Sequence, residues 1–174
     1  MNANTERIRQ LVLATTCVLT ALSARPGFAS DRSDLNATVK RMASYTSDLN
    51  AAVKKFVTDI NKGDFRSVAA ACATRASIVD GFPPYAWQTC ADWMKAYESN
   101  NKAIKATLGA LSIGKPLYME VRGNHAYLNY PVTFTDRQNG KPVSYKGSMT
   151  VTLRKTQRGW AFTGAASAWS GNTL

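Results

Sequence analysis

The sequence predicts an α+β domain in which three N-terminal helices pack on a strongly curved antiparallel sheet and enclose an internal pocket. Three observations support this fold class. Apolar residues recur at helical spacing up to about residue 100, alternate with polar residues beyond it, and are separated there by turn residues. The chain has 174 residues, of which 45% are hydrophobic and 19% charged, which suits one globular domain with a sizeable core.

The first 29 residues have the pattern of a secretory signal peptide. Arg7 and Arg9 precede an apolar stretch from Leu11 to Leu22, and small residues precede an expected cut after Ala29. This stretch is shorter than the roughly 18 apolar residues that a membrane-spanning helix needs, and no later segment approaches that length. We therefore expect an exported protein, periplasmic or secreted, with no integral membrane segment in its mature form.

The formal net charge is +11, and removal of the signal peptide takes away three basic residues and one acidic residue, which leaves +9. An excess of this size can attract polyanions. The basic residues are scattered along the chain, however, and form neither a dense run nor an aromatic-basic motif. This pattern favours a solvated basic surface, and we expect no nucleic-acid partner.

Two cysteines remain after processing, Cys72 and Cys90. In an oxidising compartment an even pair is consistent with a disulfide, which would connect the second predicted helix to the third. The alternative is a pair of buried thiols that act as small apolar side chains. The sequence leaves both alternatives open.

The predicted helices lie in the first part of the mature chain. Residues 30–45 have weak helical spacing and form either an N-terminal arm or a lead-in helix, and residues 46–174 form the domain. The first helix of the domain has an apolar stripe from Leu49 to Ile60 and ends at Gly63. Asp64 is the N-cap of a second helix, whose stripe ends at Cys72, and Thr89 begins a third.

The predicted strands are shorter and more numerous. Residues 77–80 form a brief strand that the following Gly-Phe-Pro-Pro segment must end. Residues 105–113 form the next strand, though with imperfect alternation, and three alternating segments begin near residues 117, 126 and 144. Gly123-Asn124 and Asn139-Gly140 are hairpin turns between them. A final strand runs from Trp160 to about Trp169.

The order of these elements resembles the nuclear transport factor 2-like, or SnoaL-like, superfamily, including its ketosteroid isomerases. The resemblance depends on the Asn61-Lys62-Gly63-Asp64 corner, the Ala76-to-Asp80 strand and the closing Gly159-Trp160 strand, and covers roughly residues 46–170. It implies a cone-shaped sheet with a ligand inside. It also implies a homodimer, because in this superfamily the polar face of the sheet, here Ser144 to Arg154, often pairs with a second copy.

The same resemblance makes Asp80 the candidate general base. A carboxylate between Val79 and the Gly-Phe-Pro-Pro turn is partly desolvated at the mouth of a cone, and desolvation raises a carboxyl pKa toward a useful range. Ketosteroid isomerases also need two oxyanion donors, at the positions that Phe56 and Val151 occupy here. Neither residue can donate a hydrogen bond. Tyr97 matches only a supporting tyrosine of that site.

The other candidate residues are those expected to line a ligand-binding pocket. Tyr85, Trp87 and Tyr97 follow Asp80 closely, and with Phe56 and Val151 they are the candidate pocket residues. The single histidine, His125, follows a hairpin turn and is expected at the surface. The sequence has no metal-ligand spacing, phosphate-binding loop or nucleophile motif, so we expect no metal and no cofactor.

Three functions are compatible with these features. The first is an exported, non-catalytic pocket protein that binds a small apolar or amphipathic molecule. The second is an isomerase-, lyase- or cyclase-like enzyme with Asp80 as general base. The third is an interaction module that dimerises through its sheet face.

Overall fold

The structure is a computed structural model that describes residues 28–107 and 109–172. The predicted signal peptide therefore lies almost entirely outside the described residues. Residues 46–172 belong to one compact unit and the helical residues up to Tyr45 to another. Helix α2 (Phe28–Asn61) contains residues of both units, so residues 30–45 are helical.

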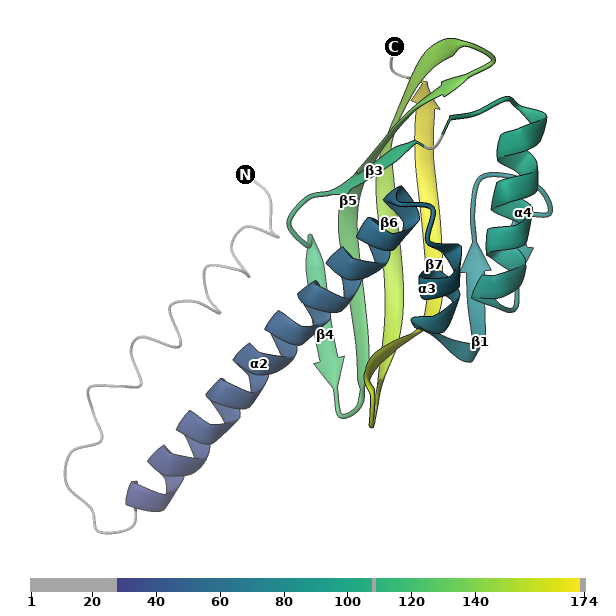
Figure 1. Ribbon diagram of the computed structural model, residues 1–174. Coiled ribbons are helices and arrows are strands. Elements are labelled where there is room, and N and C mark those ends of the chain that lie inside the picture. The colour runs from purple at the N-terminus through teal and green to yellow at the C-terminus, as the bar shows by residue number, and fades with distance from the viewer. Residues whose placement is uncertain (1–27, 108, 173–174) are drawn as a thin grey trace, which may run out of the picture. The chain divides into compact units, whose positions relative to one another are not determined.

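The second unit has three helices and seven strands within the described residues (Figure 1). The helices are the last turns of α2, α3 (Phe65–Ala70) and α4 (Cys90–Ala103). The strands are β1 (Cys72–Val79), β2 (Ala86–Trp87), β3 (Ala110–Ile113), β4 (Tyr118–Arg122), β5 (His125–Gln138), β6 (Lys141–Thr156) and β7 (Gly159–Asn172). The α+β class is thus confirmed.

The strands form one sheet in the order β2-β1-β7-β6-β5-β3, and β4 pairs with the first part of β5. The expectation of a wholly antiparallel sheet was wrong at one place, because β1 and β7 run parallel, with Val79 opposite Ala166. Parallel neighbours need a long connection between them, and here the chain from β2 to β6 supplies it. The pattern of residues within a strand does not encode whether the strand runs parallel or antiparallel to its neighbour.

One face of the sheet is covered by the helices (Figure 1). The predicted apolar stripe of α2 is buried there, with Leu49, Val53 and Phe56 at most 1% exposed. The Phe56 ring stacks on Phe162 of β7 with 4.3 Å between ring centroids. The core therefore lies between α2 and the central strands, and it is closed by side chains that alternate along β5 and β6.

Two element boundaries differ from the prediction. Asp64 caps α3 as expected, but α3 ends at Ala70 and Cys72 begins β1, because pairing with Phe162 draws that segment into the sheet. Among the described residues between 105 and 113, those that form a strand are Ala110–Ile113. The Asn61 side chain makes two 2.8 Å hydrogen bonds with the backbone of Leu111, and these bonds satisfy groups on this edge strand.

The predicted turns are confirmed. Gly123 and Asn124 join β4 to β5, and Asn139 and Gly140 join β5 to β6 with positive φ angles of 49° and 78°. Positive φ at both central residues is the requirement of the turn that matches the twist of a hairpin. The exposed His125 lies at the first of these turns, as predicted.

Cys72 and Cys90 form a disulfide, which decides between the two alternatives left by the sequence. The bond joins the start of β1 to the start of α4. It therefore connects the strand that leads to Asp80 with the helix that carries Trp93 and Tyr97.

Among the described helices, none combines the length and the apolar character that crossing a membrane requires.

Replacing both cysteines by alanine should lower the free energy of unfolding by about 3 kcal/mol, because the disulfide closes a loop with a sequence separation of 18 and restricts the unfolded chain. Chemical denaturation of the oxidised protein and the double variant measures the difference. The oxidised protein treated with a reductant should match the variant. Labelling of two free thiols in unreduced, unfolded protein would contradict the assignment.

Candidate functional site

Asp80 follows the last residue of β1 and begins a tight turn. Its backbone N–H donates to the carbonyl of Tyr85 at 3.1 Å, and the N–H of Tyr85 donates to the carbonyl of Phe82 at 2.8 Å. The Pro83-Pro84 peptide bond within the turn is cis, and Tyr85 has a φ of 72°. Two prolines remove backbone donors, so the strand ends here and the Asp80 side chain is placed at its end.

Three N–H groups from three parts of the chain donate to the Asp80 carboxylate. The Gly81 backbone N–H and the Trp169 indole reach Oδ1, at 2.8 and 3.1 Å. The Trp93 indole reaches Oδ2 at 3.2 Å. Gly81 also gives Trp169 room, because a Cβ at position 81 would lie 3.1 Å from the indole Cδ1. The carboxylate therefore joins the turn, α4 and β7.

Burial raises the pKa of the Asp80 carboxyl above its ordinary value, and the hydrogen bonds from Trp169, Gly81 and Trp93 oppose that rise in this order. The pKa is raised on balance because neutral N–H dipoles replace only part of the hydration that an ionised carboxylate loses. A raised carboxyl pKa at a cavity is typical of functional sites.

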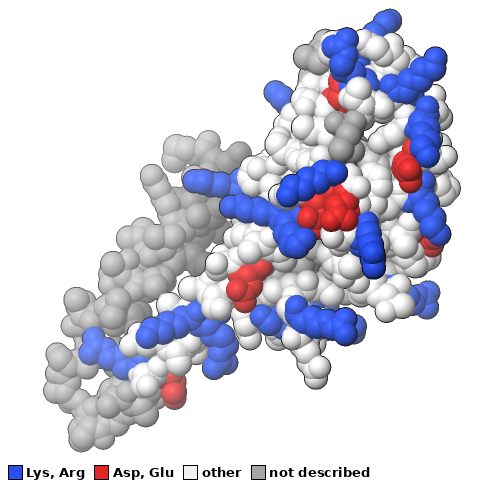
Figure 2. Space-filling view, viewed as in Figure 1, with Lys and Arg blue, Asp and Glu red and all other residues white. Residues whose placement is uncertain are grey.

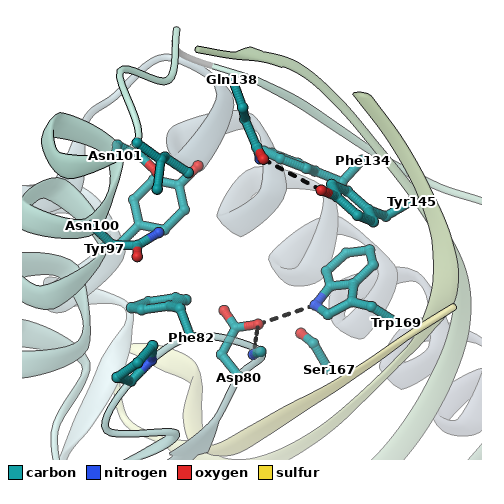
Figure 3. A pocket seen from close by; sticks show the side chains of 13 residues that line it. Asp80, Phe82, Tyr97, Asn100, Asn101, Phe134, Gln138, Tyr145, Ser167 and Trp169 are labelled. Atoms are coloured by element: carbon teal, nitrogen blue, oxygen red, sulfur yellow. Dashed lines mark hydrogen bonds between the residues drawn. The ribbon is translucent and has the colours of Figure 1, made fainter. Parts of the chain in front are cut away.

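Asp80 faces a pocket of about 560 Å³. Figure 3 shows Phe82 and Tyr97 on one side of the pocket, Phe134, Tyr145 and Trp169 on the other, and Asp80 between the two sides. The complete lining consists of Asp80, Gly81, Phe82, Pro83, Tyr97, Asn100, Asn101, Ile104, Phe134, Gln138, Tyr145, Ser167 and Trp169. Aromatic walls with a few convergent polar groups are the usual composition of a small-molecule site.

The end of the pocket away from Asp80 is polar but neutral. The Tyr145 hydroxyl donates to Gln138 Oε1 at 3.3 Å. Burial raises the pKa of the Tyr97 phenol, a hydrogen bond with Asn101 opposes the rise, and the negative charges of Asp136 and Asp80 add to it. The Tyr97 phenol therefore stays protonated at neutral pH and can donate a hydrogen bond to a ligand.

The structure brings together only some of the candidate pocket residues. Asp80 and Tyr97 line the pocket. Trp87 is buried behind it, with its ring centroid 4.9 Å from that of Phe82, and Tyr85 is 57% exposed. Phe56 and Val151 lie in the hydrophobic core, at 1% and 0% exposure.

Solved structures of other proteins share the fold of this chain. One is a nuclear transport factor 2-like protein from Novosphingobium aromaticivorans with a cystatin-like fold, at 15% identity and a TM-score of 0.64, with 76% of this chain and 86% of that chain covered. A nuclear transport factor 2-like superfamily protein from Salmonella enterica has 14% identity and a TM-score of 0.64, covering 76% and 96%. The chain has the nuclear transport factor 2-like fold.

A candidate scytalone dehydratase from Novosphingobium aromaticivorans shares this fold at 12% identity, with a TM-score of 0.63 and coverage of 81% of this chain and 90% of that chain. No protein-family model matches the sequence, and the comparison with curated proteins gave no significant match. Identities this low establish the nuclear transport factor 2-like fold and nothing about activity.

Sequence reasoning missed the two tryptophans that hold Asp80. Trp169 lies on β7, where inward-facing residues alternate and Ser167 also reaches the pocket. The register of β1 on β7, in which Val79 pairs with Ala166, brings Asp80 level with the second half of β7, and no local pattern in the sequence encodes that pairing. Trp93 of α4 is buried in the core, and its indole N–H is the donor to Asp80 Oδ2.

The described residues contain no group of three or more His, Cys, Asp or Glu side chains placed to hold a metal ion.

The pH dependence of stability should differ between the wild type and Asp80→Asn. Because the pKa of Asp80 is raised in the folded state, the native protein binds the proton more tightly than the unfolded chain. Stability therefore falls as pH rises from the ordinary carboxyl pKa through the raised one, and this loss remains at neutral pH. The asparagine variant lacks the titration, so its melting temperature relative to wild type should increase from acidic to neutral pH.

The measurement is how the difference in melting temperature between the two proteins changes with pH. The difference itself contains a constant offset, because the asparagine oxygen cannot accept hydrogen bonds from all three donors. Thermal melts from acidic to neutral pH supply it. Glu98→Gln, which removes an exposed carboxylate from α4, is the matched control. A difference between wild type and Asp80→Asn that is constant with pH would contradict the burial of an ionisable Asp80.

Proposed function

We propose that this chain is an exported pocket protein that binds a small amphipathic molecule, with its polar group at Asp80 and its apolar body between the aromatic walls. The observation that carries the proposal is a desolvated carboxylate that faces a pocket of about 560 Å³. This volume lies within the range of about 300 to 1,000 Å³ for small-molecule sites. A carboxylate that is unfavourable to bury is retained where a ligand uses it.

Export is part of the proposal and has two supports. The first 29 residues have signal-peptide character, and the Cys72–Cys90 disulfide is of a kind that persists in oxidising compartments.

The aromatic side chains supply the binding energy for the apolar body. Phe82 and Tyr97 have ring centroids 6.0 Å apart on one wall, and Phe134 and Trp169 have centroids 6.2 Å apart on the other. Rings that are already packed against each other lose little conformational freedom when a ligand enters between them. The amides of Asn100, Asn101 and Gln138 provide donors and acceptors for a second polar group.

Catalysis by Asp80 is the second candidate function. The raised pKa of Asp80 favours it, because a base with a pKa nearer neutrality transfers protons more effectively. A relative in fold, the candidate scytalone dehydratase, supports a lyase among the possible reactions. Against it, Phe56 and Val151 are buried in the core and offer no oxyanion donor. Binding without turnover therefore remains the preferred function.

The outer face of the sheet favours an additional role in homodimer formation. Val79 and Tyr127 are 49% and 42% exposed on strands of this sheet, and Ser148, Thr150 and Thr152 of β6 are uncharged and half-buried. A sheet face of this composition can pair with a second copy through a two-fold axis.

The pocket can be tested by filling it. Ser167→Phe places a ring in the hollow and should weaken binding roughly tenfold or more, because the ligand and the new ring compete for one volume. Tryptophan fluorescence and melting temperature are measured across a panel of lipids, steroids and polyketides, and Ser170→Phe, at an exposed position of the same strand, is the control. Retained binding in Ser167→Phe, or no response of the wild type to any compound, would contradict the proposal.

Turnover separates the binding protein from the enzyme. A compound from the panel that binds is incubated with wild type and Asp80→Asn, and products are followed by mass spectrometry. The binding function predicts no product from either protein. A product formed by wild type and lost in the folded Asp80→Asn variant would establish the general-base alternative instead.

Dimer formation predicts a concentration-dependent sedimentation coefficient. Thr150→Lys places like charges opposite each other across a two-fold axis and should yield a monomer. Ser99→Lys, at an exposed position of α4, should leave the dimer intact. A wild type that sediments as a monomer at every concentration refutes this role.

A further inference from the structure

The charge of the pocket is opposite to that of the protein as a whole. Figure 2 shows Lys and Arg side chains spread over the visible face with fewer Asp and Glu side chains between them, and the net charge of the full chain is +11. Among the described residues that line the pocket, Asp80 alone has a formal charge at neutral pH. The interior surface that a ligand meets is therefore anionic.

Asp80 has hydrogen-bond donors but no counter-charge among the described residues. Its donors are two indoles and one backbone amide, all neutral, and none of the ion pairs of the described residues includes it. Buried carboxylates are ordinarily paired with a cation, because neutral donors do not compensate fully for lost hydration. A ligand that binds next to Asp80 can supply the positive charge that these donors lack.

Among the residues that the structure describes, the groups that face Asp80 are neutral. Helix α4 presents Trp93 and Tyr97, β7 presents Ser167 and Trp169, and the turn presents Gly81 and Phe82. Asp136 of β5 acts on Tyr97 from farther away and adds negative charge. No lysine or arginine among the described residues lines the pocket to compete with a cationic ligand.

The walls also suit a cation. Five aromatic side chains line the pocket on the two sides of Asp80, and the negative faces of aromatic rings attract ammonium groups (Figure 3). A carboxylate between aromatic walls combines charge pairing with this attraction. An anionic ligand would meet Asp80 without any neutralising partner.

We propose that the pocket selects a small organic cation, an ammonium group on a compact apolar body, over neutral and anionic molecules of the same shape. This inference rests on the proposed binding function and adds the chemical class of the ligand. The ammonium group lies against Asp80, and the apolar body lies between the Phe82–Tyr97 and Phe134–Trp169 pairs.

Three probes of matched size test the proposal: 2-phenylethylammonium, 2-phenylethanol and phenylacetate. Binding is followed by NMR through the indole N–H signals of Trp93 and Trp169, with Trp160 as a reporter outside the pocket lining. The ammonium probe should bind roughly tenfold or more tightly than the alcohol, since charge pairing and cation–π attraction act on it alone. Phenylacetate should bind most weakly.

Asp80→Asn should remove the preference, so that ammonium and alcohol bind alike, and Glu98→Gln should retain it. If the asparagine variant does not fold, the wild type supplies the same test by pH. Affinity for the ammonium probe should fall as acid protonates Asp80, whereas affinity for the alcohol should change little. An ammonium affinity that is unchanged by acid or by Asp80→Asn overturns the proposal.

The outcomes also separate this inference from the binding function on which it rests. Equal affinity for ammonium and alcohol, or tighter binding of the alcohol, overturns the cation preference and leaves a neutral-ligand pocket. Absence of binding by all three probes overturns the cation preference too. If solvent extraction of the purified protein also yields no small molecule, the proposed binding function fails with it.

Discussion

The parallel pairing of β1 with β7 is the constraint on which the site depends. These two strands are separated in the sequence by α4 and all the other strands, so their contact closes a long loop of the chain. Their register places Val79 opposite Ala166 and brings Asp80 next to the second half of β7. The Cys72–Cys90 disulfide fixes the start of α4 to the start of β1. Trp169 and Trp93 then reach the two oxygens of one carboxylate from different elements.

The sequence predicted those parts of the fold that local chemistry determines. Asp64 and Thr89 accept hydrogen bonds at the starts of their helices, and Asn139-Gly140 supplies two positive φ angles, so each of these features is determined by a few neighbouring residues. The length and direction of β1 were not predictable in this way, because both depend on a partner strand far along the chain. The hydrogen bonds of Asn61 to Leu111 have the same origin.

Only part of the candidate site could be predicted, because the site too depends on residues that lie far apart in the sequence. Periodicity tells which residues of α2 and β6 face inward, but the interior of this sheet contains both a packed core and a hollow. Phe56 stacks on Phe162 and fills the first region, whereas Asp80 and Tyr97 border the second. Which part stays open depends on the summed volumes of side chains from several elements, and no single segment encodes that sum. Phe56 and Val151, which we expected to line the pocket, lie instead in the packed core.

The buried carboxylate and the basic exterior act on different length scales. The field of the exposed lysines and arginines is screened within about 8 to 10 Å at physiological salt, and it influences mainly the approach of a charged molecule. Inside the pocket, water is partly replaced by aromatic rings, so the interaction with Asp80 is stronger there than at the surface. A positive protein can therefore hold a cation, because the charge nearest the ligand is negative and the neutral walls around it are aromatic rings whose faces attract a cation. The unfavourable burial of the Asp80 carboxylate is then the reason that the pocket selects a cation, since only a positively charged ligand offsets the cost of that burial.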